Sequence, residues 1–98
     1  MRAVRQAAQL EIQIEGPQPS QYAEIFSRCC GERGIEFQQG AVDHIYRRWY
    51  EGRGIHPRAC HPRDLLRILV GFARYHNVAP TFTPEMVDRA CQVYFAVF

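Results

Sequence analysis

Cysteine and histidine are the residue types in this sequence most able to do chemistry, because both bind zinc and both serve in nucleophilic catalysis. They are His56, Cys60 and His61, close together before the longest helical run, and Cys29, Cys30 and His44 earlier in the chain. No C-x-x-C pair and no H-x-x-x-H spacing occurs among them. We therefore expect packing and helix-capping roles for these side chains, and no metal site.

Signatures of complete catalytic machinery are missing as well. The sequence has no nucleophile elbow, no P-loop and no G-x-G-x-x-G run. Its 98 residues make one domain with a modest core, which is small for an enzyme with a cofactor domain. We expect that this chain is no enzyme on its own, and we assign it no catalytic residue.

The strongest chemical pattern is a row of arginines on the run that opens His61-Pro62-Arg63-Asp64-Leu65-Leu66. At ~100° per residue, Arg63, Arg67 and Arg74 fall within about 40° of one another. One interpretation is a core helix with a solvated arginine face. The other is that Arg63, in the first helical turn, contacts an anionic group. Periodicity alone does not choose between them.

Residues 62–76 are predicted to form the helix that carries these arginines. Pro62 suits a first helical turn, because its missing N–H is no loss there and its φ is already helical. About half of the circumference, mostly facing away from the arginines, is apolar. We expect this arc to be buried: Leu65, Leu66, Ile68, Leu69, Phe72, Ala73 and Tyr75.

Three further amphipathic helices are predicted, at residues 20–30, at residues 39–50 and from Pro84 onward. Ser20 is the expected N-cap of the first and Thr83 of the last. The expected inward side chains are Tyr22, Ile25, Phe26, Cys29, Val42, Ile45, Tyr46, Trp49, Met86, Val87, Ala90, Cys91 and Tyr94. Four such helices with short loops predict an all-α fold, a small four-helix bundle.

An alternating segment precedes these helices. Leu10-Glu11-Ile12-Gln13-Ile14-Glu15 alternates apolar and polar residues, which predicts a strand or extended segment, and Gly16-Pro17 ends it. A single strand is not stable without a partner. It either pairs with another molecule or belongs to a sheet that lies upstream.

Composition and cysteine usage indicate where the protein acts. No apolar run approaches the ~18–20 residues of a transmembrane helix, and the N-terminus lacks the apolar region of a signal peptide. Four cysteines without a secretory signal are expected to be reduced thiols. We therefore expect a soluble cytoplasmic protein that does not contact a membrane.

A small helical nucleic-acid-binding module is the main alternative from another class. Its basic face would be formed by Arg63, Arg67 and Arg74 with Arg47, Arg48 and Arg58. However, a net charge of +2 is close to neutral. The loop before residue 62 is also long and contains a proline, whereas a helix-turn-helix uses a turn of about three or four residues. We rank this alternative, with nucleic acid as a partner, second.

Several short motifs follow one another in a fixed order. They are Ile12-Gln13-Ile14-Glu15-Gly16-Pro17, Tyr22-Ala23-Glu24-Ile25-Phe26, Gly34-Ile35-Glu36-Phe37, Cys60-His61-Pro62-Arg63-Asp64-Leu65-Leu66, Phe82-Thr83-Pro84-Glu85 and Ala90-Cys91-Gln92-Val93-Tyr94-Phe95. In this order they resemble the C-terminal helical lid of a bacterial AAA+ ATPase. The resemblance covers about four-fifths of the chain, and Pro-Arg-Asp-Leu-Leu is its most specific part.

This resemblance implies a division of the chain and a role for one arginine. Residues 1–15 would be the end of a core domain, and residues 16–98 the lid domain. Arg63 would be the sensor 2 residue, which reaches the phosphates of ATP bound between lid and core, with Arg67 and Arg74 as secondary candidates on the same anion-facing side. Walker A, Walker B, sensor 1 and the arginine finger belong to the core domain. The fragment would therefore hold no cofactor, whereas its full-length parent would bind ATP and Mg.

The resemblance also implies partners. They would be the protein's own ATPase core domain and the neighbouring subunits of a hexamer. The alternating segment at residues 10–14 additionally predicts a homodimer that truncation would induce, because an exposed strand edge pairs readily. An adaptor domain without a ligand is the third interpretation.

Overall fold

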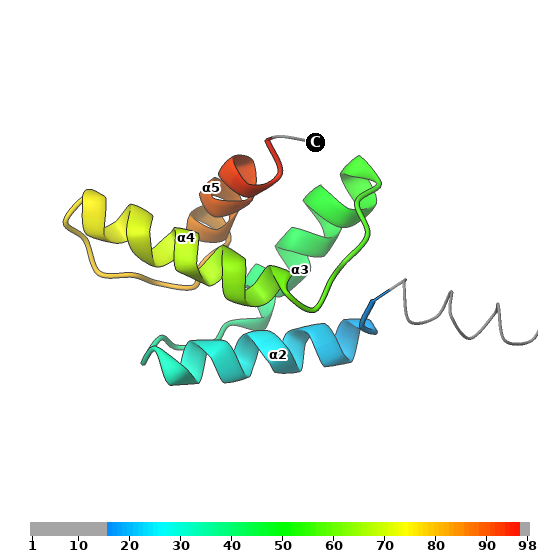
Figure 1. Cartoon of the computed structure of the whole chain (residues 1–98), viewed down its shortest axis with the longest axis horizontal. Coiled ribbons are helices and arrows are strands. Elements are labelled where there is room, and N and C mark those ends of the chain that lie inside the picture. Colours follow the sequence, from blue (N-terminus) through cyan, green and yellow to red (C-terminus); the bar gives the residue numbers. More distant parts are fainter. Residues whose placement is uncertain (1–15, 97–98) are drawn as a thin grey trace, which may run out of the picture.

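The computed structural model describes residues 16–96, and this part of the chain is helical throughout (Figure 1). The elements are α2 (Pro19–Glu32), α3 (Gln39–Ile45), η1 (Tyr46–Glu51), α4 (His61–Tyr75) and α5 (Pro84–Tyr94). Because α3 continues directly into η1, residues 16–96 form a four-helix bundle without strands, and the predicted all-α fold is confirmed. The strand predicted at residues 10–15 lies outside the described residues.

The first helix begins one position earlier than predicted. Gln18, not Ser20, is the N-cap of α2, and its backbone N–H donates to Oε1 of Gln21 at 2.9 Å. Pro19 takes the first helical position, where its ring pre-sets φ, so that Ser20 already lies inside the first turn. The prediction of Ser20 as N-cap was therefore wrong.

The predicted bounds of α4 and the predicted start of α5 agree with the structure to within a residue. Asn77 adopts a left-handed φ of 58° after α4, and the Val78 N–H donates to the Ala73 carbonyl oxygen at 2.9 Å, which closes the helix end. At the start of α5, Thr83 Oγ1 accepts a hydrogen bond from the Met86 N–H at 3.3 Å. The prediction of Thr83 as N-cap is confirmed.

The second predicted helix changes type in its middle. After Ile45 the backbone becomes a π-helix, η1, whose wider turn brings both Trp49 and Tyr50 into the core, at 3% and 4% exposure. The expectation of an inward Trp49 is confirmed. Tyr50 was not among the predicted inward side chains, although it follows Tyr46 by four residues.

The core lies between all four helices. Large, fully buried side chains come from each of them, from the loop before α5 and from the C-cap of α5: Tyr22, Phe26, Ile45, Leu65, Leu66, Leu69, Phe82, Val87 and Phe95. α4 packs against both α5 and α2, while α3 packs against α5. None of the described helices is long and apolar enough to cross a membrane.

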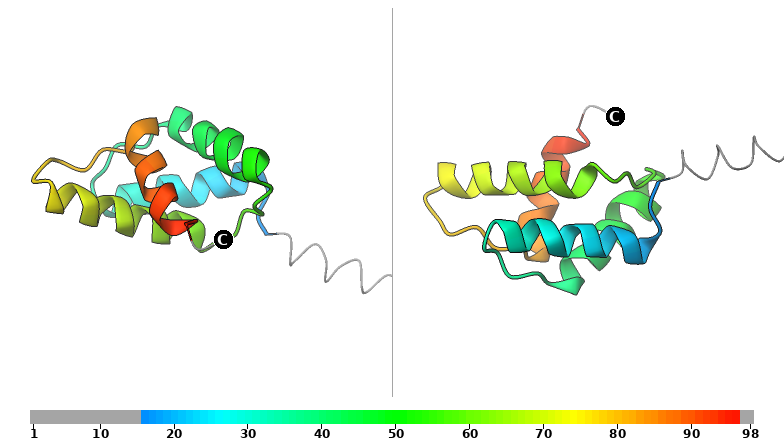
Figure 2. Two further views of the ribbon diagram at one scale, coloured as in Figure 1. Left: turned by 90° about the horizontal axis from the view of Figure 1, so that it is seen from above. Right: turned by 60° about the horizontal axis from the view of Figure 1, so that its bottom comes forward.

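One residue of the expected buried arc of α4 is not buried. Tyr75 is 84% exposed, and Ile68 and Phe72 are only partly buried. The last turn of α4 projects past α5 and past the end of α2 in every view, so no element covers Tyr75 (Figures 1 and 2). The prediction for Tyr75 was wrong, because periodicity gives a direction around a helix but not the reach of its neighbours.

The described chain starts against the loop that leads into α4. Gly16 has a φ of +91°, and a Cβ atom at this position would collide with the Pro57 carbonyl oxygen. Only glycine therefore fits both the backbone angle and the contact. The start of α2 and the start of α4 consequently lie at one end of the bundle, opposite the α4–α5 loop (Figure 2).

Candidate functional site

The run His61–Leu66 forms the first two turns of α4, and most of it is structural. Four of its six residues are buried, namely His61, Pro62, Leu65 and Leu66. Leu65 and Leu66 are part of the main hydrophobic core, at 1% and 0% exposure. Burial therefore accounts for these four residues without any ligand.

His61 is held by hydrogen bonds from two directions. Its Nδ1 atom lies 2.8 Å from the Tyr50 hydroxyl and accepts from the Arg58 backbone N–H at 3.3 Å. The Tyr22 hydroxyl lies 2.6 Å from that of Tyr50 and extends the chain of hydrogen bonds into the core. Because Nδ1 accepts from a backbone N–H, the ring is neutral with its proton on Nε2. This network joins α2, η1 and α4.

Burial sets the protonation state of His61. It lowers the pKa of the imidazole to about 4, and the positive charge of Arg58 acts in the same direction against a smaller opposite effect of Asp64. His61 is therefore uncharged near neutral pH, and it acts as a packing and hydrogen-bonding residue at the start of α4.

Asp64 is engaged by α5. Its Oδ2 atom accepts a hydrogen bond from the Tyr94 hydroxyl at 2.7 Å. Burial first, and then this hydrogen bond and the carboxylate charge, raise the pKa of Tyr94, so the phenol stays protonated and remains a donor. The contact fixes the residue that directly follows Arg63.

Arg63 is the one residue of the run whose side chain is mostly in solvent. Its side chain is 63% exposed, and Nε lies 3.6 Å from Oδ1 of Asp64, a long and weak ion pair at the surface. The sequence placed Arg63 in the first helical turn on the polar side of the helix, and the structure confirms that position. Its guanidinium is available to a group outside the bundle.

Arg28 on α2 and Arg33, the C-cap of α2, act electrostatically on the same thiol as Arg63, and sequence reasoning did not identify this. Burial and the Glu32 carboxylate raise the pKa of the Cys29 thiol on α2. The positive charges of Arg28, Arg33 and Arg63 act on the same thiol in the opposite direction. The guanidinium groups of Arg28, Arg33 and Arg63 therefore influence one thiol. The packing of α2 on α4 creates this proximity, which no local spacing reveals.

Arg67 and Arg74 are exposed on the same side of α4 as Arg63. Within residues 16–96 neither of them forms an ion pair with a carboxylate. Arg48, from the alternative basic face, is in a different state. Its Nε atom lies 3.0 Å from Asp88 Oδ1, and its guanidinium lies over the Trp49 ring. Of the arginines proposed for one basic face, Arg48 is therefore paired with Asp88, whereas Arg67 and Arg74 have no carboxylate partner among the described residues.

Asp88 on α5 is the centre of a second polar cluster. Its Oδ1 atom accepts hydrogen bonds from His44 Nε2 and Trp49 Nε1, each at 2.9 Å, and lies near Arg48. Its Oδ2 atom accepts from Gln92 at 3.0 Å. Burial raises the pKa of Asp88, but these hydrogen bonds and the Arg48 charge outweigh it and hold the pKa below its usual range.

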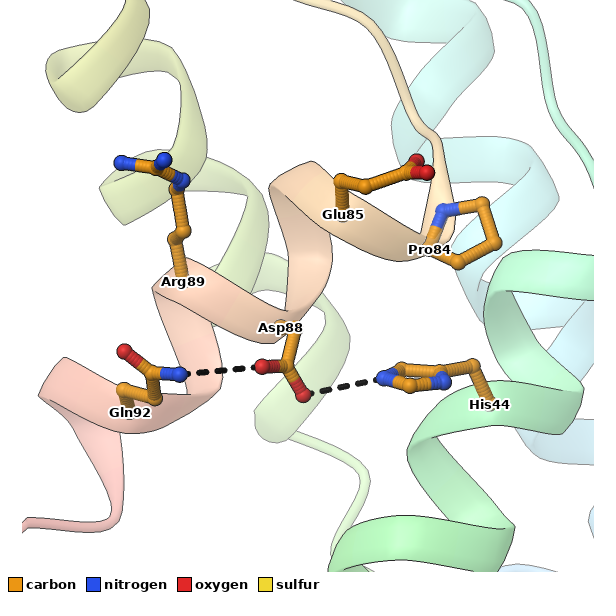
Figure 3. A pocket seen from close by; sticks show the side chains of 6 residues that line it. All are labelled: His44, Pro84, Glu85, Asp88, Arg89 and Gln92. Atoms are coloured by element: carbon orange, nitrogen blue, oxygen red, sulfur yellow. Dashed lines mark hydrogen bonds and ion pairs between the residues drawn. The ribbon is translucent and has the colours of Figure 1, made fainter.

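His44, Asp88 and Gln92 of this cluster line a surface groove of about 580 Å³ between α3 and α5 (Figure 3). The groove is lined by His44, Pro84, Glu85, Asp88, Arg89 and Gln92. Both oxygens of Asp88 are already occupied by donors of the chain itself. The cluster therefore ties α5 to α3 and η1, and we assign it a structural role.

The cysteines and histidines do not come together in a metal site. Among residues 16–96, no group of three or more His, Cys, Asp or Glu side chains is placed to hold a metal ion. All four cysteines are free thiols, with Cys30 and Cys91 buried and Cys60 exposed.

The chain belongs to a protein family that is described as a domain of unknown function (DUF8689), whose model matches residues 18–93. The matched segment runs from the N-cap of α2 into the last turn of α5, and it includes the Arg63 region and the Asp88 cluster. Comparison with the curated proteins and with the solved structures gave no match.

Proposed function

We propose that this chain is the C-terminal lid domain of an AAA+ ATPase, in which Arg63 senses the phosphates of ATP bound by a core domain. The supporting observation is that, in the run His61–Leu66, only the Arg63 side chain is mostly exposed. His61, Pro62, Leu65 and Leu66 are buried and Asp64 is bound to Tyr94, whereas the Arg63 side chain is 63% exposed. The motif builds a rigid start of α4, and only its arginine is left for an external contact.

The physical chemistry of this position suits a phosphate. The first turn of a helix carries the positive end of its dipole, and a guanidinium adds planar donors that match phosphate oxygens. Asp64 already neutralises part of the Arg63 charge, but at 3.6 Å the pair is weak and exposed. A phosphate with two negative charges would compete successfully for the guanidinium.

The position of Gly16 supports the same proposal. Its contact with Pro57 holds the start of the described chain beside the loop that leads into α4. A core domain joined on the N-terminal side of Gly16 would therefore lie at the end of the bundle where Arg63 is exposed. The nucleotide would bind between the two domains, and ATP and Mg would belong to the full-length parent. Its other partners would be the neighbouring subunits of a hexamer.

The first test is the mass of the native gene product in source cells, detected by an antibody against this domain. A band several times larger than 11.4 kDa is expected. The second test is ATP turnover by the full-length protein with Arg63→Ala, for which we expect a large loss of rate with an unchanged melting temperature.

Arg67→Ala is the matched control, because Arg67 lies one turn further along the same face and its substitution removes the same charge. It should reduce turnover far less than Arg63→Ala. A native product of about 11.4 kDa, or normal turnover by Arg63→Ala, would contradict the proposal.

A further inference from the structure

The exposed end of α4 carries a bare aromatic ring among positive charges. Tyr75 is 84% exposed, the most exposed of the large hydrophobic side chains in residues 16–96. Its neighbour Arg74 and, two turns earlier, Arg67 are exposed and have no carboxylate partner within the described residues. We call the surface of Arg67, Gly71, Arg74 and Tyr75 the Tyr75 face.

Gly71 leaves part of the α4 backbone in the Tyr75 face without a side chain. It lies in the interior of α4, where glycine destabilises a helix by roughly 1 kcal/mol relative to alanine. A Cβ atom at Gly71 would meet no other atom within 4 Å, so neither packing nor a close approach within the bundle requires the glycine. Along the helix surface it lies three and four residues from Arg74, Tyr75 and Arg67, so these side chains surround an uncovered stretch of backbone.

The charge around this face has one sign along the chain. From Leu65 to Pro84 the sequence contains no aspartate or glutamate, but it contains Arg67 and Arg74. Arg89 of α5 adds a further guanidinium, which lies 5.2 Å from the centre of the Phe72 ring. The formal charges on residues 65–84, which include the Tyr75 face, are therefore all positive and would attract a negatively charged ligand.

The Tyr75 ring is positioned by the hydrogen bonds that close the end of α4 and by the neighbouring His76 ring. His76 donates its backbone N–H to the Phe72 carbonyl oxygen, and Val78 donates to that of Ala73. The His76 ring lies edge-on to Tyr75 with ring centres 5.1 Å apart, and it also contacts Phe72 at 4.3 Å. The Tyr75 ring is thus placed on a capped helix end, which lowers the entropy lost when a ligand binds to it.

We propose that a single-stranded nucleic acid binds across the Tyr75 face, with a base stacked on the Tyr75 ring and phosphates beside Arg67 and Arg74. Exposed aromatic rings among arginines are the recurring elements of such sites, because every base has a flat face and every nucleotide a charge. The uncovered backbone at Gly71 lets the strand approach α4 closely. The argument from turn length concerns helix-turn-helix readers of duplex DNA and does not apply to this mode. The net charge of the whole chain is only +2, but the charged side chains of the Tyr75 face, Arg67 and Arg74, are both positive.

This inference goes beyond the proposed lid function and does not depend on it. Tyr75 follows Arg63 by twelve residues of α4, a separation of about 18 Å along the helix axis. A nucleotide at Arg63 and a strand at Tyr75 would occupy opposite ends of α4. Failure of one proposal therefore leaves the other unaffected.

The test is fluorescence anisotropy of a labelled oligothymidylate titrated with the 98-residue chain at low salt. We expect binding that weakens steeply with salt, because neutralised phosphates release counterions. Tyr75→Leu should weaken binding roughly tenfold, whereas Tyr75→Phe should retain it, since stacking requires an aromatic ring. Arg74→Ala should weaken binding and reduce the salt slope by about one.

Two further variants separate this site from general effects. Arg47→Ala removes the same charge from an exposed position on η1 and should change binding far less than Arg74→Ala. Gly71→Ala should raise the melting temperature, because alanine favours the helix, and should weaken binding, because its methyl group fills the approach to the backbone. A variant that is more stable and yet binds less tightly cannot be explained by misfolding.

Three results would overturn the proposal. The first is no binding of the oligothymidylate at low salt. The second is binding that Tyr75→Leu leaves unchanged, which would mean that the face attracts anions without stacking. The third is an equal loss for Arg47→Ala and Arg74→Ala, which would mean that charge attracts the strand without a defined site.

Discussion

The Tyr94 hydroxyl donates a 2.7 Å hydrogen bond to Oδ2 of Asp64, and so the last turn of α5 holds the first turn of α4. Asp64 is adjacent to Arg63, whose guanidinium lies 3.6 Å from the other carboxylate oxygen. The tyrosine therefore fixes the orientation of the carboxylate that the arginine contacts. Although it touches no external group itself, Tyr94 positions the residue that we propose as the sensor.

Tyr94→Phe removes this hydrogen bond and keeps the ring. We expect it to lower the free energy of unfolding by about 1–2 kcal/mol, because a charged acceptor loses its donor in a partly buried position. Denaturant unfolding measures the change. Tyr75→Phe is the control and should leave stability unaltered, since the Tyr75 hydroxyl is in solvent. Equal stability of the two variants would show that the Tyr94 contact contributes nothing.

The buried His61 makes stability depend on pH. Its pKa is about 4 in the folded state and 6.5 in the unfolded state, so the unfolded chain takes up the proton first. Its contribution is complete above pH 6.5 and is lost progressively as the pH falls from 6.5 towards 4. The difference between the two pKa values corresponds to roughly 3 kcal/mol.

Unfolding free energies measured across this pH range test the prediction. His61→Gln should be less stable at neutral pH and should lose the part of the slope between pH 6.5 and 4. His76→Gln changes an exposed histidine and should retain the slope of the parent chain. If His61→Gln and the parent chain have parallel profiles, His61 is not buried as a neutral ring.

Asp88→Asn tests the cluster that ties α5 to α3 and η1. The asparagine side chain is uncharged, so it loses the ion pair with Arg48. Its NH₂ group is also a donor, and it would face the donors that now bind the Asp88 carboxylate. We expect a loss of about 2 kcal/mol in stability and a shifted emission of Trp49, the single tryptophan, whose indole N–H is bonded to Asp88. Asp43→Asn, on an exposed turn of α3, is the control and should change neither quantity appreciably.

Sequence patterns predicted the helices well because each has a strong local signal. Thr83 followed by Pro84 fixes the start of α5, and Pro62 with the apolar arc fixes α4 to within a residue. The exposed row Arg63, Arg67 and Arg74 followed from helical spacing alone. These features depend on residues only a few positions apart, where backbone geometry decides the outcome.

The features that were missed depend on contacts between distant segments. Tyr75 has the correct direction for burial, but α4 projects past its neighbours, so nothing covers it. The hydrogen bonds of Asp88 with His44 and Trp49 join residues about forty positions apart. No periodicity encodes such pairs. For the same reason the sequence did not predict the hydrogen bond between His61 and Tyr50, which forms because η1 turns Tyr50 into the core.

Gly16→Ala tests how firmly the start of the described chain is held against α4. The substitution adds backbone strain at a φ of +91° and a collision with the Pro57 carbonyl oxygen. Gly34→Ala is the matched control, because Gly34 also has a positive φ, of +70°, but its Cβ would meet no atom within 4 Å. We expect Gly34→Ala to lower stability by about 1 kcal/mol through strain alone.

Gly16→Ala should lower stability by more than this, because the loop at Pro57 must move as well. The proposed lid function additionally predicts that Gly16→Ala reduces ATP turnover by the full-length parent although Arg63 is intact, since a displaced start of the lid would change where Arg63 lies relative to the core. Gly34→Ala, with comparable strain at the far end of α2, should leave turnover near normal. Equal effects of the two variants on stability and turnover would show that the contact of Gly16 with Pro57 does not orient the lid.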